Sequence, residues 1–189
     1  MQEIVIRCAW ITDPLMQKYH DEEWGVPLRD DRKLFEFMVL DAFQAGLSWK
    51  TVLNKRENFR KAFDNFDATK IALYNEEKYE SLLADTGIIR NRAKICGTIE
   101  NAKAFLNLRE EFGSFDHYIW SYVDYKPIIN TWKSLSEIPA KTEISDRLSK
   151  DLTGRGFKFA GSTICYAFMQ AAGMVNDHVT GCFRHSELK

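Results

Sequence analysis

Four cysteine and histidine side chains near the two ends of the chain have the types and spacing of a metal site. His178 and Cys182 are four residues apart, which suits chelation from one helical turn, and Cys8 and His20 flank a short predicted helix. Together they would make a closed, tetrahedral Cys₂His₂ zinc site with no open position for water. Because the two pairs lie far apart in sequence, spacing alone favours unrelated buried thiols and surface histidines, and His185 is a competing ligand.

An acid and an amide interrupt an otherwise apolar helix that we expect to begin after a cap at Asp30 or Asp31. Asp41 and Gln44 are three residues apart, so they project from one face of this helix. A carboxylate in such surroundings is strongly destabilising unless a partner pairs with it. Asp41 is therefore a candidate for binding a cationic ligand, and the alternative is a structural acid that caps or pairs inside the core.

The turn that follows this helix carries a second set of candidate residues. Gly46 suits the C-terminal end of the helix, Leu47 protrudes on the turn, and Ser48 caps a new helix that Trp49 opens. An acid, a glycine turn, a leucine and a tryptophan thus fall within nine residues. We interpret the stretch DAFQAGLSW as the wall and rim of a pocket.

A basic turn lies further along the chain, in LLADTGIIRNRAK at 82–94. It resembles a helix-hairpin-helix, in which a glycine turn presents backbone N–H groups to a DNA phosphate at a helix N-terminus. The usual second glycine is replaced by Ile89, two residues after Gly87. Local positive charge comes from Arg90, Arg92 and Lys94. The motif alone leaves an ordinary helix–turn–helix connection with a basic surface equally open.

The elements that would position these residues are helices, and we predict an all-α protein. Helical patterns run from Pro14 to about His20, from Ser48 to about Phe63, from Asn91 to Leu108 and from Ser162 to Ala172, with another capped by Ser145. Only 124–130 offers a weak strand. The second of these helices should carry a basic outer face of Lys50, Lys55, Arg56 and Arg60. Cys96 and Cys165 lie in apolar helical patterns and should belong to the core.

Composition excludes several classes of protein. Of the 189 residues, 45% are hydrophobic, which is ample for one packed domain spanning 1–189. A net charge of −1 argues against non-specific coating of a polyanion, so any DNA contact must be a local patch. No signal-peptide pattern and no run of membrane-spanning length occur. We expect a cytoplasmic, monomeric protein that has no membrane partner and keeps its cysteines as thiols or metal ligands.

Several runs of residues together resemble the type I 3-methyladenine DNA glycosylases, bacterial repair enzymes of the helix-hairpin-helix superfamily. The similarity covers almost the whole chain. It runs through RCAW (7–10), YHDEEWGVP (19–27), QAGLSW (44–49), KREN (55–58), GIIRNRAKI (87–95), LSEIP (135–139), RGFKF (155–159) and NDHVTGC (176–182).

The resemblance implies a helix-hairpin-helix glycosylase fold in which a zinc clamp joins the N- and C-terminal segments. Residues 30–160 would form the helical core, with the hairpin at 83–92, while 1–29 and 161–189 would combine as a zinc-binding lobe. The family's structural zinc ligands fall on Cys8, His20, His178 and Cys182.

The resemblance also implies an activity, the hydrolysis of the N-glycosidic bond of 3-methyladenine in alkylated double-stranded DNA. The enzyme would flip the cationic base into an aromatic, acidic pocket and leave an abasic site. The expected pocket residues are Tyr19, Trp49, Trp10 and the catalytic acid Asp41, which would also bind the free base as product. The expected DNA-binding residues are Gly46, Leu47, Gly87, Ile88, Arg90 and Arg92.

One departure from the family lies in the pocket itself. The family has glutamate followed by glycine where this chain has Asp41 and Ala42. The shorter acid leaves open a glycosylase of the same fold with another alkylated-base preference, and a non-catalytic module that binds distorted DNA is the remaining alternative. Trp24 could be pocket or core, and so could Trp10. No catalytic role is assigned to Asp124, since the type I enzymes lack the aspartate that many superfamily members carry after the hairpin.

Overall fold

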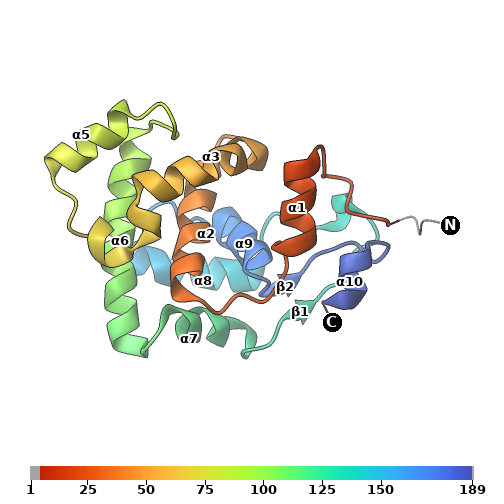
Figure 1. The fold of residues 1–189 in the computed structure, drawn as a ribbon. Coiled ribbons are helices and arrows are strands. Elements are labelled where there is room, and N and C mark those ends of the chain that lie inside the picture. The colour runs from red at the N-terminus through yellow and green to blue at the C-terminus, as the bar shows by residue number, and fades with distance from the viewer. Residues whose placement is uncertain (1–4, 189) are drawn as a thin grey trace.

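The computed structural model describes residues 5–188 as helices packed around a central one, α2 (Asp31–Gln44) (Figure 1). The other helices of the first part of the chain are α1 (Pro14–Glu22), α3 (Trp49–Ala62), η1 (Asp64–Phe66), α4 (Ala68–Ile71), α5 (Glu76–Ala84) and α6 (Arg92–Phe112). The elements that follow are α7 (Phe115–Trp120), η2 (Ser121–Val123), β1 (Ile128–Ile129), η3 (Leu135–Glu137), α8 (Glu143–Gly154), α9 (Ser162–Ala171), β2 (Val175–Asn176) and α10 (Phe183–Glu187).

Helix α2 is buried on every side, as its nearly continuous apolar sequence predicts. Every residue from Leu34 to Phe43 is buried, and α3, α6, α7 and α9 all pack against the helix. Its start is fixed by Asp30, whose side chain accepts a hydrogen bond from the Lys33 N–H. The central helix therefore carries Asp41 into the interior and ends at the protein surface.

Most helix starts are set by side-chain caps. Asp13, Ser48, Asn75 and Asn91 accept backbone hydrogen bonds at the starts of α1, α3, α5 and α6. The expectation for α8 is wrong by one turn, because Thr142 is its cap. Ser145 is instead the third residue of the helix, where its hydroxyl accepts a hydrogen bond from the Thr142 N–H in a reciprocal capping box.

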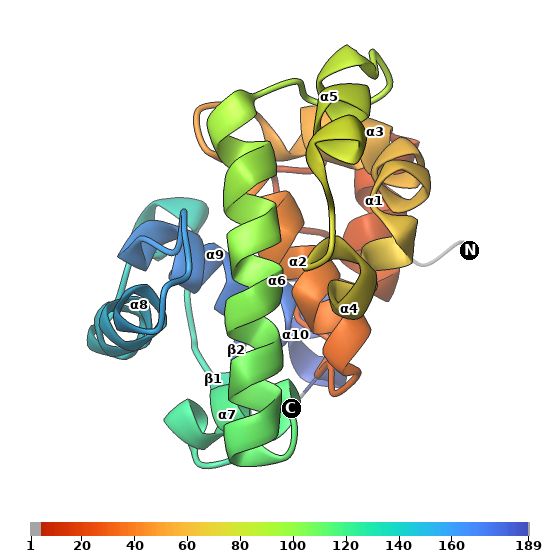
Figure 2. The same cartoon turned by 90° about the vertical axis from the view of Figure 1, so that its left-hand side faces the viewer.

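The expected hairpin corresponds to α5, the turn at 85–91 and the start of α6. Figure 2 shows α6 running along one face of the molecule, with α5 lying beside its first turns. Cys96 lies on the outer side of α6 and is exposed, so its expected place in the core is wrong, whereas Cys165 on α9 is buried. The stripe of α6 that packs inward instead includes Ile95 and Ala102.

The two ends of the described chain meet on the side of the molecule opposite α5 and α6 (Figure 1). The weak strand expected at 124–130 is present as β1, which pairs in parallel with β2 and so joins the middle of the chain to its C-terminal part. On the same side α10 lies beside α1, where the rings of Phe183 and His20 are 6.2 Å apart. Across residues 5–188, no helix combines the length and the apolar character needed to cross a bilayer.

Candidate functional site

A cavity of about 440 Å³ opens between α1, α2, the start of α3 and α9. Its aromatic wall brings together residues from three separate segments. The ring centroids of Tyr19 and Trp49 are 5.2 Å apart, those of Trp10 and Tyr19 are 6.4 Å apart, and Trp10 packs edge-on to Trp24 at 5.2 Å. All four rings line the cavity, so Trp10 and Trp24 are pocket residues as well as packing residues. Such a wall suits a flat, aromatic ligand.

Asp41 supplies the only acid among the residues that line this cavity. Its side chain is 2% exposed, and its Oδ2 atom has no hydrogen-bond partner within the described chain. Burial raises the pKa of Asp41 well above its usual value, because removal from water disfavours the charged carboxylate. Unpartnered buried carboxylate oxygens are rare in folded proteins, and this one lies in a cavity wall. The Asp41 carboxyl is therefore placed to bind a ligand that can donate a hydrogen bond or carry positive charge.

A second unpartnered atom lies in the same cavity wall. The indole Nε1 of Trp49 is buried and makes no hydrogen bond to any residue between 5 and 188. Tyr19 is 4% exposed, and burial followed by the nearby Asp41 charge raises the pKa of its phenol. Tyr19 therefore stays neutral, with a π face that is available to a cationic ring. Both observations agree with the expected grouping of Tyr19, Trp49 and Asp41.

The opposite wall was missed by the sequence reasoning. It includes Leu135, Ile138, Pro139 and Ala140, three of which belong to the LSEIP run, together with Tyr166 and Gln170 on α9. The buried Asp177 holds these two side chains: its Oδ2 atom accepts hydrogen bonds from the Tyr166 hydroxyl at 2.6 Å and the Gln170 amide at 2.8 Å. A polar residue repeated at positions 166 and 170, one turn apart on an apolar helix, is the signal that could have found this wall.

The turn after α2 places its two expected DNA-binding residues at the surface. Gly46 has a φ of +80°, a conformation that residues with a Cβ rarely adopt, and Leu47 is 45% exposed. The Leu47 N–H donates to the Gln44 carbonyl at 2.6 Å, which closes the turn. An exposed leucine thus projects from the rim of the cavity.

The hairpin turn keeps the expected basic residues at its surface only in part. Arg90 and Arg92 are exposed, but the side chain of Ile88 is buried, so any contact of Ile88 with DNA would use its backbone. Lys94 does not join the exposed cations. It is 8% exposed and its Nζ atom donates to the carbonyls of Phe43 and Ala45.

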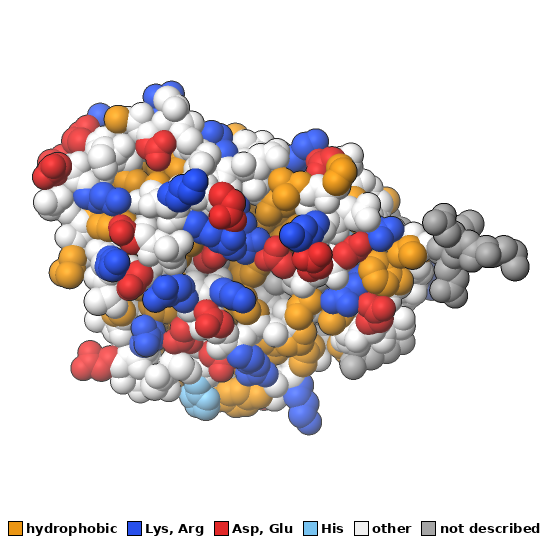
Figure 3. All heavy atoms as spheres, in the orientation of Figure 1, with side chains coloured by type: hydrophobic (Ala, Val, Ile, Leu, Met, Phe, Trp, Pro, Cys, Tyr) orange, Lys and Arg blue, Asp and Glu red, His pale blue; other side chains and the backbone are white. Residues whose placement is uncertain are grey.

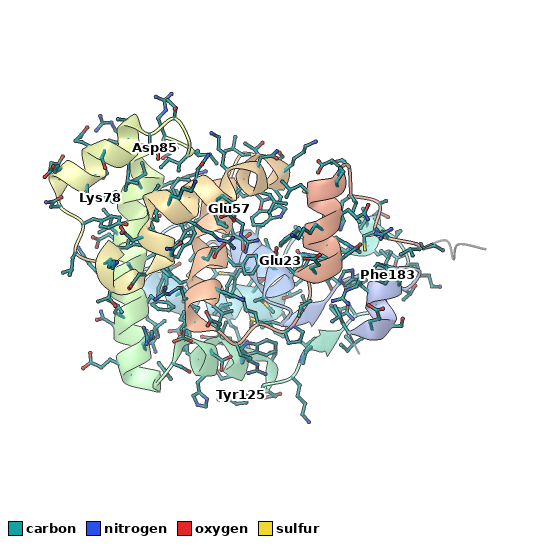
Figure 4. The ribbon with its side chains drawn as sticks, in the orientation of Figure 1. Glu23, Glu57, Lys78, Asp85, Tyr125 and Phe183 are labelled. Atoms are coloured by element: carbon teal, nitrogen blue, oxygen red, sulfur yellow. The ribbon has the colours of Figure 1, made fainter. Side chains whose placement is uncertain are left out.

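The expected basic outer face of α3 is also largely absent, because its cations are paired. Arg56 is buried between Glu36 and Glu23, Arg60 pairs with Glu36 and Glu57, and Lys50 pairs with Asp13. Figure 4 labels Glu57 on α3 and Glu23, which directly follows α1. On the face that Figure 3 shows, acidic and basic side chains are accordingly interspersed.

The four expected metal-ligating residues converge in one buried cluster. The donor atoms of Cys8, His20, His178 and Cys182 all lie within 4.8 Å of one another. Sulfur–nitrogen separations are 3.4 Å to 3.7 Å and the two ring nitrogens are 3.1 Å apart. His185 is not part of the cluster, since its Nε2 atom bonds to the Asn130 carbonyl at 2.8 Å. These four residues could hold a metal ion.

The second ring nitrogen of each clustered histidine has its own partner. His20 Nδ1 lies 2.7 Å from an Asp21 carboxylate oxygen, and His178 Nε2 lies 3.0 Å from the Trp24 carbonyl. Arg7 in turn holds Asp21 through an ion pair at 2.8 Å. Outer partners of this kind orient metal-binding imidazoles and fix which nitrogen is free to bind.

Asp124 lies away from the cavity. It forms the left-handed residue that follows η2, it is exposed, and it does not line the aromatic cavity. Figure 4 shows its neighbour Tyr125 at the opposite edge of the molecule from the hairpin residue Asp85.

Residues 10–185 match the model of a protein family described as methyladenine glycosylase. The chain belongs to this methyladenine glycosylase family. It is 54% identical over 177 residues to DNA-3-methyladenine glycosylase 1 of Escherichia coli (strain K12), a match that covers 93% of this chain and 95% of the relative. It is 47% identical over 177 residues to DNA-3-methyladenine glycosylase of Haemophilus influenzae, with coverage of 93% and 96%.

The fold agrees with solved members of the family. A crystal structure of 3-methyladenine DNA glycosylase I superposes with a TM-score of 0.92 at 55% identity and covers 94% of this chain and 98% of that one. A structure from Staphylococcus aureus that describes 3-methyladenine recognition superposes with a TM-score of 0.91 at 34% identity, with coverage of 94% and 95%. The resemblance inferred from the sequence runs is thereby confirmed.

Proposed function

We propose that this chain is a DNA glycosylase that hydrolyses the N-glycosidic bond of 3-methyladenine in alkylated double-stranded DNA. The observation that carries the proposal is the unpartnered carboxylate oxygen of Asp41 inside an aromatic cavity. Methylation at N3 gives the adenine ring a positive charge, which the carboxylate and the aromatic faces would both attract. The relatives named for the same activity support it over 95% and 96% of their length.

The mechanism follows from the contacts that the cavity residues would make with a flipped base. Tyr19 and Trp49 would stack on the ring while Asp41 pairs with its charge. As the glycosidic bond breaks, its electron pair neutralises the departing base, and a water molecule adds to the sugar carbon and releases a proton. No lysine lines the cavity among the described residues, so no Schiff base would form and the product would be an abasic site.

DNA would be held by the surface features beside the cavity. Leu47 on its glycine turn would fill the gap that the flipped base leaves in the stack. The hairpin turn would offer the backbone N–H of Ile88 to a phosphate, since that of Gly87 donates to Asp85, and Arg90 and Arg92 would add positive charge. Free 3-methyladenine would bind in the same cavity after release. A monomeric state and a cytoplasmic location stay predictions from the sequence.

The metal that best fits the four-residue cluster is zinc, in a structural role. With zinc–sulfur bonds of about 2.3 Å and zinc–nitrogen bonds of about 2.1 Å, tetrahedral geometry places sulfur and nitrogen about 3.6 Å apart. The observed sulfur–nitrogen separations of 3.4 Å to 3.7 Å agree with that value. The ion would be held by Cys8, His20, His178 and Cys182. It would cross-link the 1–29 and 161–189 segments into one lobe.

Metal analysis tests this assignment directly. The purified protein should contain one zinc per chain, and Cys182→Ala should lose zinc together with several kcal/mol of stability, because structural zinc binding is coupled to folding. Cys165→Ala is the matched control, since Cys165 is buried outside the cluster. A folded wild-type protein without metal would refute the clamp.

Identification of the bases released from methylated duplex DNA tests the proposed activity. We expect free 3-methyladenine and an unbroken strand that carries an abasic site. Release of another methylated base without 3-methyladenine would assign a different lesion, which the shorter acid at Asp41 would then explain. Release of no base at all would leave only a module that binds distorted DNA.

A further inference from the structure

Lys94 holds the turn that carries Leu47 by hydrogen bonds to backbone carbonyls. The Nζ atom of Lys94 donates hydrogen bonds to the Phe43 carbonyl at 2.9 Å and to the Ala45 carbonyl at 2.6 Å. Both carbonyls belong to the C-terminal end of α2, where the helix dipole concentrates negative charge. Lys94 itself lies in the first turn of α6, immediately after the hairpin. One side chain therefore joins the hairpin helix to the base of the Gly46–Leu47 turn.

A second lysine makes the reverse connection. Lys55 lies on α3, the helix that begins directly after the Leu47 turn, and its Nζ atom donates to the carbonyls of Thr86 and Gly87 at 3.1 Å each. The Asn58 amide adds a bond to the Gly87 carbonyl at 3.2 Å. Helix α3, which follows the Leu47 turn, thus holds the hairpin. Helix α6, which follows the hairpin, holds the Leu47 turn.

The hairpin turn is shaped to allow this contact. A Cβ atom at Gly87 would lie 2.9 Å from an Asp85 carboxylate oxygen and 3.3 Å from the Asn58 side chain. The Gly87 N–H donates to the same Asp85 oxygen at 2.7 Å. Figure 4 shows Asp85 in this turn, at the end of α5. The glycine therefore lets α3 approach the hairpin closely enough for Lys55 and Asn58 to reach its carbonyls.

The charged form of Lys94 is less favourable than that of an exposed lysine facing DNA. Burial lowers its pKa from the usual value, because the charged amine has lost water. Two carbonyls compensate for part of that loss. By contrast Gly46 has open space around it, and Leu47 is 45% exposed. A buried cation thus supports a turn whose apolar tip is exposed.

We propose that Lys94 is a positioning residue that fixes the Gly46–Leu47 tip relative to the phosphate-binding hairpin, with Lys55 completing the connection. This inference rests on the proposed function, in which Leu47 enters the DNA stack. Insertion succeeds only if the tip lies at the correct distance from the phosphates that the hairpin holds. Misplacement of about 1 Å can lower a rate about 100-fold.

A double-mutant cycle with Leu47 tests the proposal. Lys94→Met removes the donors and keeps the side-chain length, and Leu47→Ala removes the tip. The single-turnover rate of 3-methyladenine release from duplex DNA should fall about 10- to 100-fold for Lys94→Met in the wild-type background. In the Leu47→Ala background the same change should lower it by no more than about 3-fold, because interacting residues are not additive.

Three controls separate this role from a general loss of structure. Binding of free 3-methyladenine should be unchanged in Lys94→Met, because the cavity does not contain Lys94. Lys103→Met on the outer side of α6, where the lysine pairs only with the exposed Glu100, should leave release unchanged. Lys94→Gln, which retains amide donors, should be intermediate if Lys94→Met folds poorly.

A duplex with a tetrahydrofuran abasic analogue opposite 2-aminopurine gives a readout that needs no bond cleavage. Insertion of Leu47 should change the 2-aminopurine fluorescence in the wild type, and Lys94→Met should reduce that change. The proposal would be overturned if Lys94→Met lowered the release rate by the same factor with Leu47 and with Ala at that position. It would also be overturned if Lys94→Met left the fluorescence change unreduced. A wild type that releases no base would refute the proposed function, while this duplex would still test Lys94.

Discussion

Two buried aspartates near one cavity have opposite surroundings. Asp177 is 1% exposed and accepts four hydrogen bonds. Its donors are Asn130 Nδ2, Trp132 Nε1, the Tyr166 hydroxyl and Gln170 Nε2, at 2.6 Å to 2.8 Å. Asp41 is 2% exposed, and its Oδ2 atom accepts none. Two similarly buried aspartates thus differ: Asp177, behind the residues of one wall, is saturated with hydrogen bonds, whereas Asp41, in the wall itself, has an oxygen that accepts none from residues 5–188.

The difference indicates which acid is structural and which awaits a ligand. A saturated carboxylate stabilises the groups that donate to it, and Asp177 thereby fixes Tyr166 and Gln170 in the cavity wall. An unsaturated one destabilises the empty protein and is stabilised only by a bound partner. Selection for stability alone would remove an unsaturated buried carboxylate, so the presence of one at Asp41 argues for ligand binding.

Replacement of Asp41 should have the largest effect on activity. Asp41→Asn keeps the shape and removes the charge, so the rate of 3-methyladenine release should fall about 100- to 1,000-fold, as for other groups that stabilise charge in a dry site. The measurement is single-turnover release from duplex DNA. Asp41→Glu is the matched control, because it keeps the charge and restores the family's longer acid, and it should retain far more activity than Asp41→Asn. Equal losses in both would contradict a charge-pairing role.

Replacement of Asp177 should show the reverse pattern. In Asp177→Asn an amide group would face four donors, so at least one of them loses its acceptor, and stability should fall by about 2–3 kcal/mol. Urea unfolding measures that loss, and zinc content should be measured alongside because His178 is the next residue. Asp41→Asn should not be destabilised in the same assay. An unchanged midpoint for Asp177→Asn would remove the distinction between the two acids.

Sequence alone could predict what depends on neighbouring residues. The caps at Asp13, Asp30, Ser48 and Asn91 act over two or three residues, so the helices they begin were predicted closely. The buried α2 helix was also visible, because an apolar pattern that covers nearly every side has one structural interpretation. These features carry one wall of the cavity.

The other wall and the lysine connections could not be predicted in this way. Asp177 gathers donors from two segments, residues 130–132 and α9, that meet it only in the folded chain, and nothing in its immediate sequence indicates them. Lys94 has a long, flexible side chain, so its place in a basic hairpin suggested DNA while its amine reaches back to α2. Cys96 shows the same limit, because an apolar helical pattern does not say which side of α6 packs inward.

The pH dependence of stability gives the smallest and most specific test of the comparison. Because burial raises the pKa of Asp41, the native state holds a proton there at pH values where the unfolded chain, with a pKa of about 4, has lost it. The contribution of neutral Asp41 is therefore complete below about pH 4 and is lost as the pH rises towards the raised native pKa. The slope is at most about 1.4 kcal/mol per pH unit. Asp41→Asn does not titrate, so urea unfolding from pH 4 to pH 8 should show it gaining stability relative to the wild type as pH rises. A difference that stays constant across this range would mean that Asp41 has a partner in the free protein, and the contrast with Asp177 would then disappear.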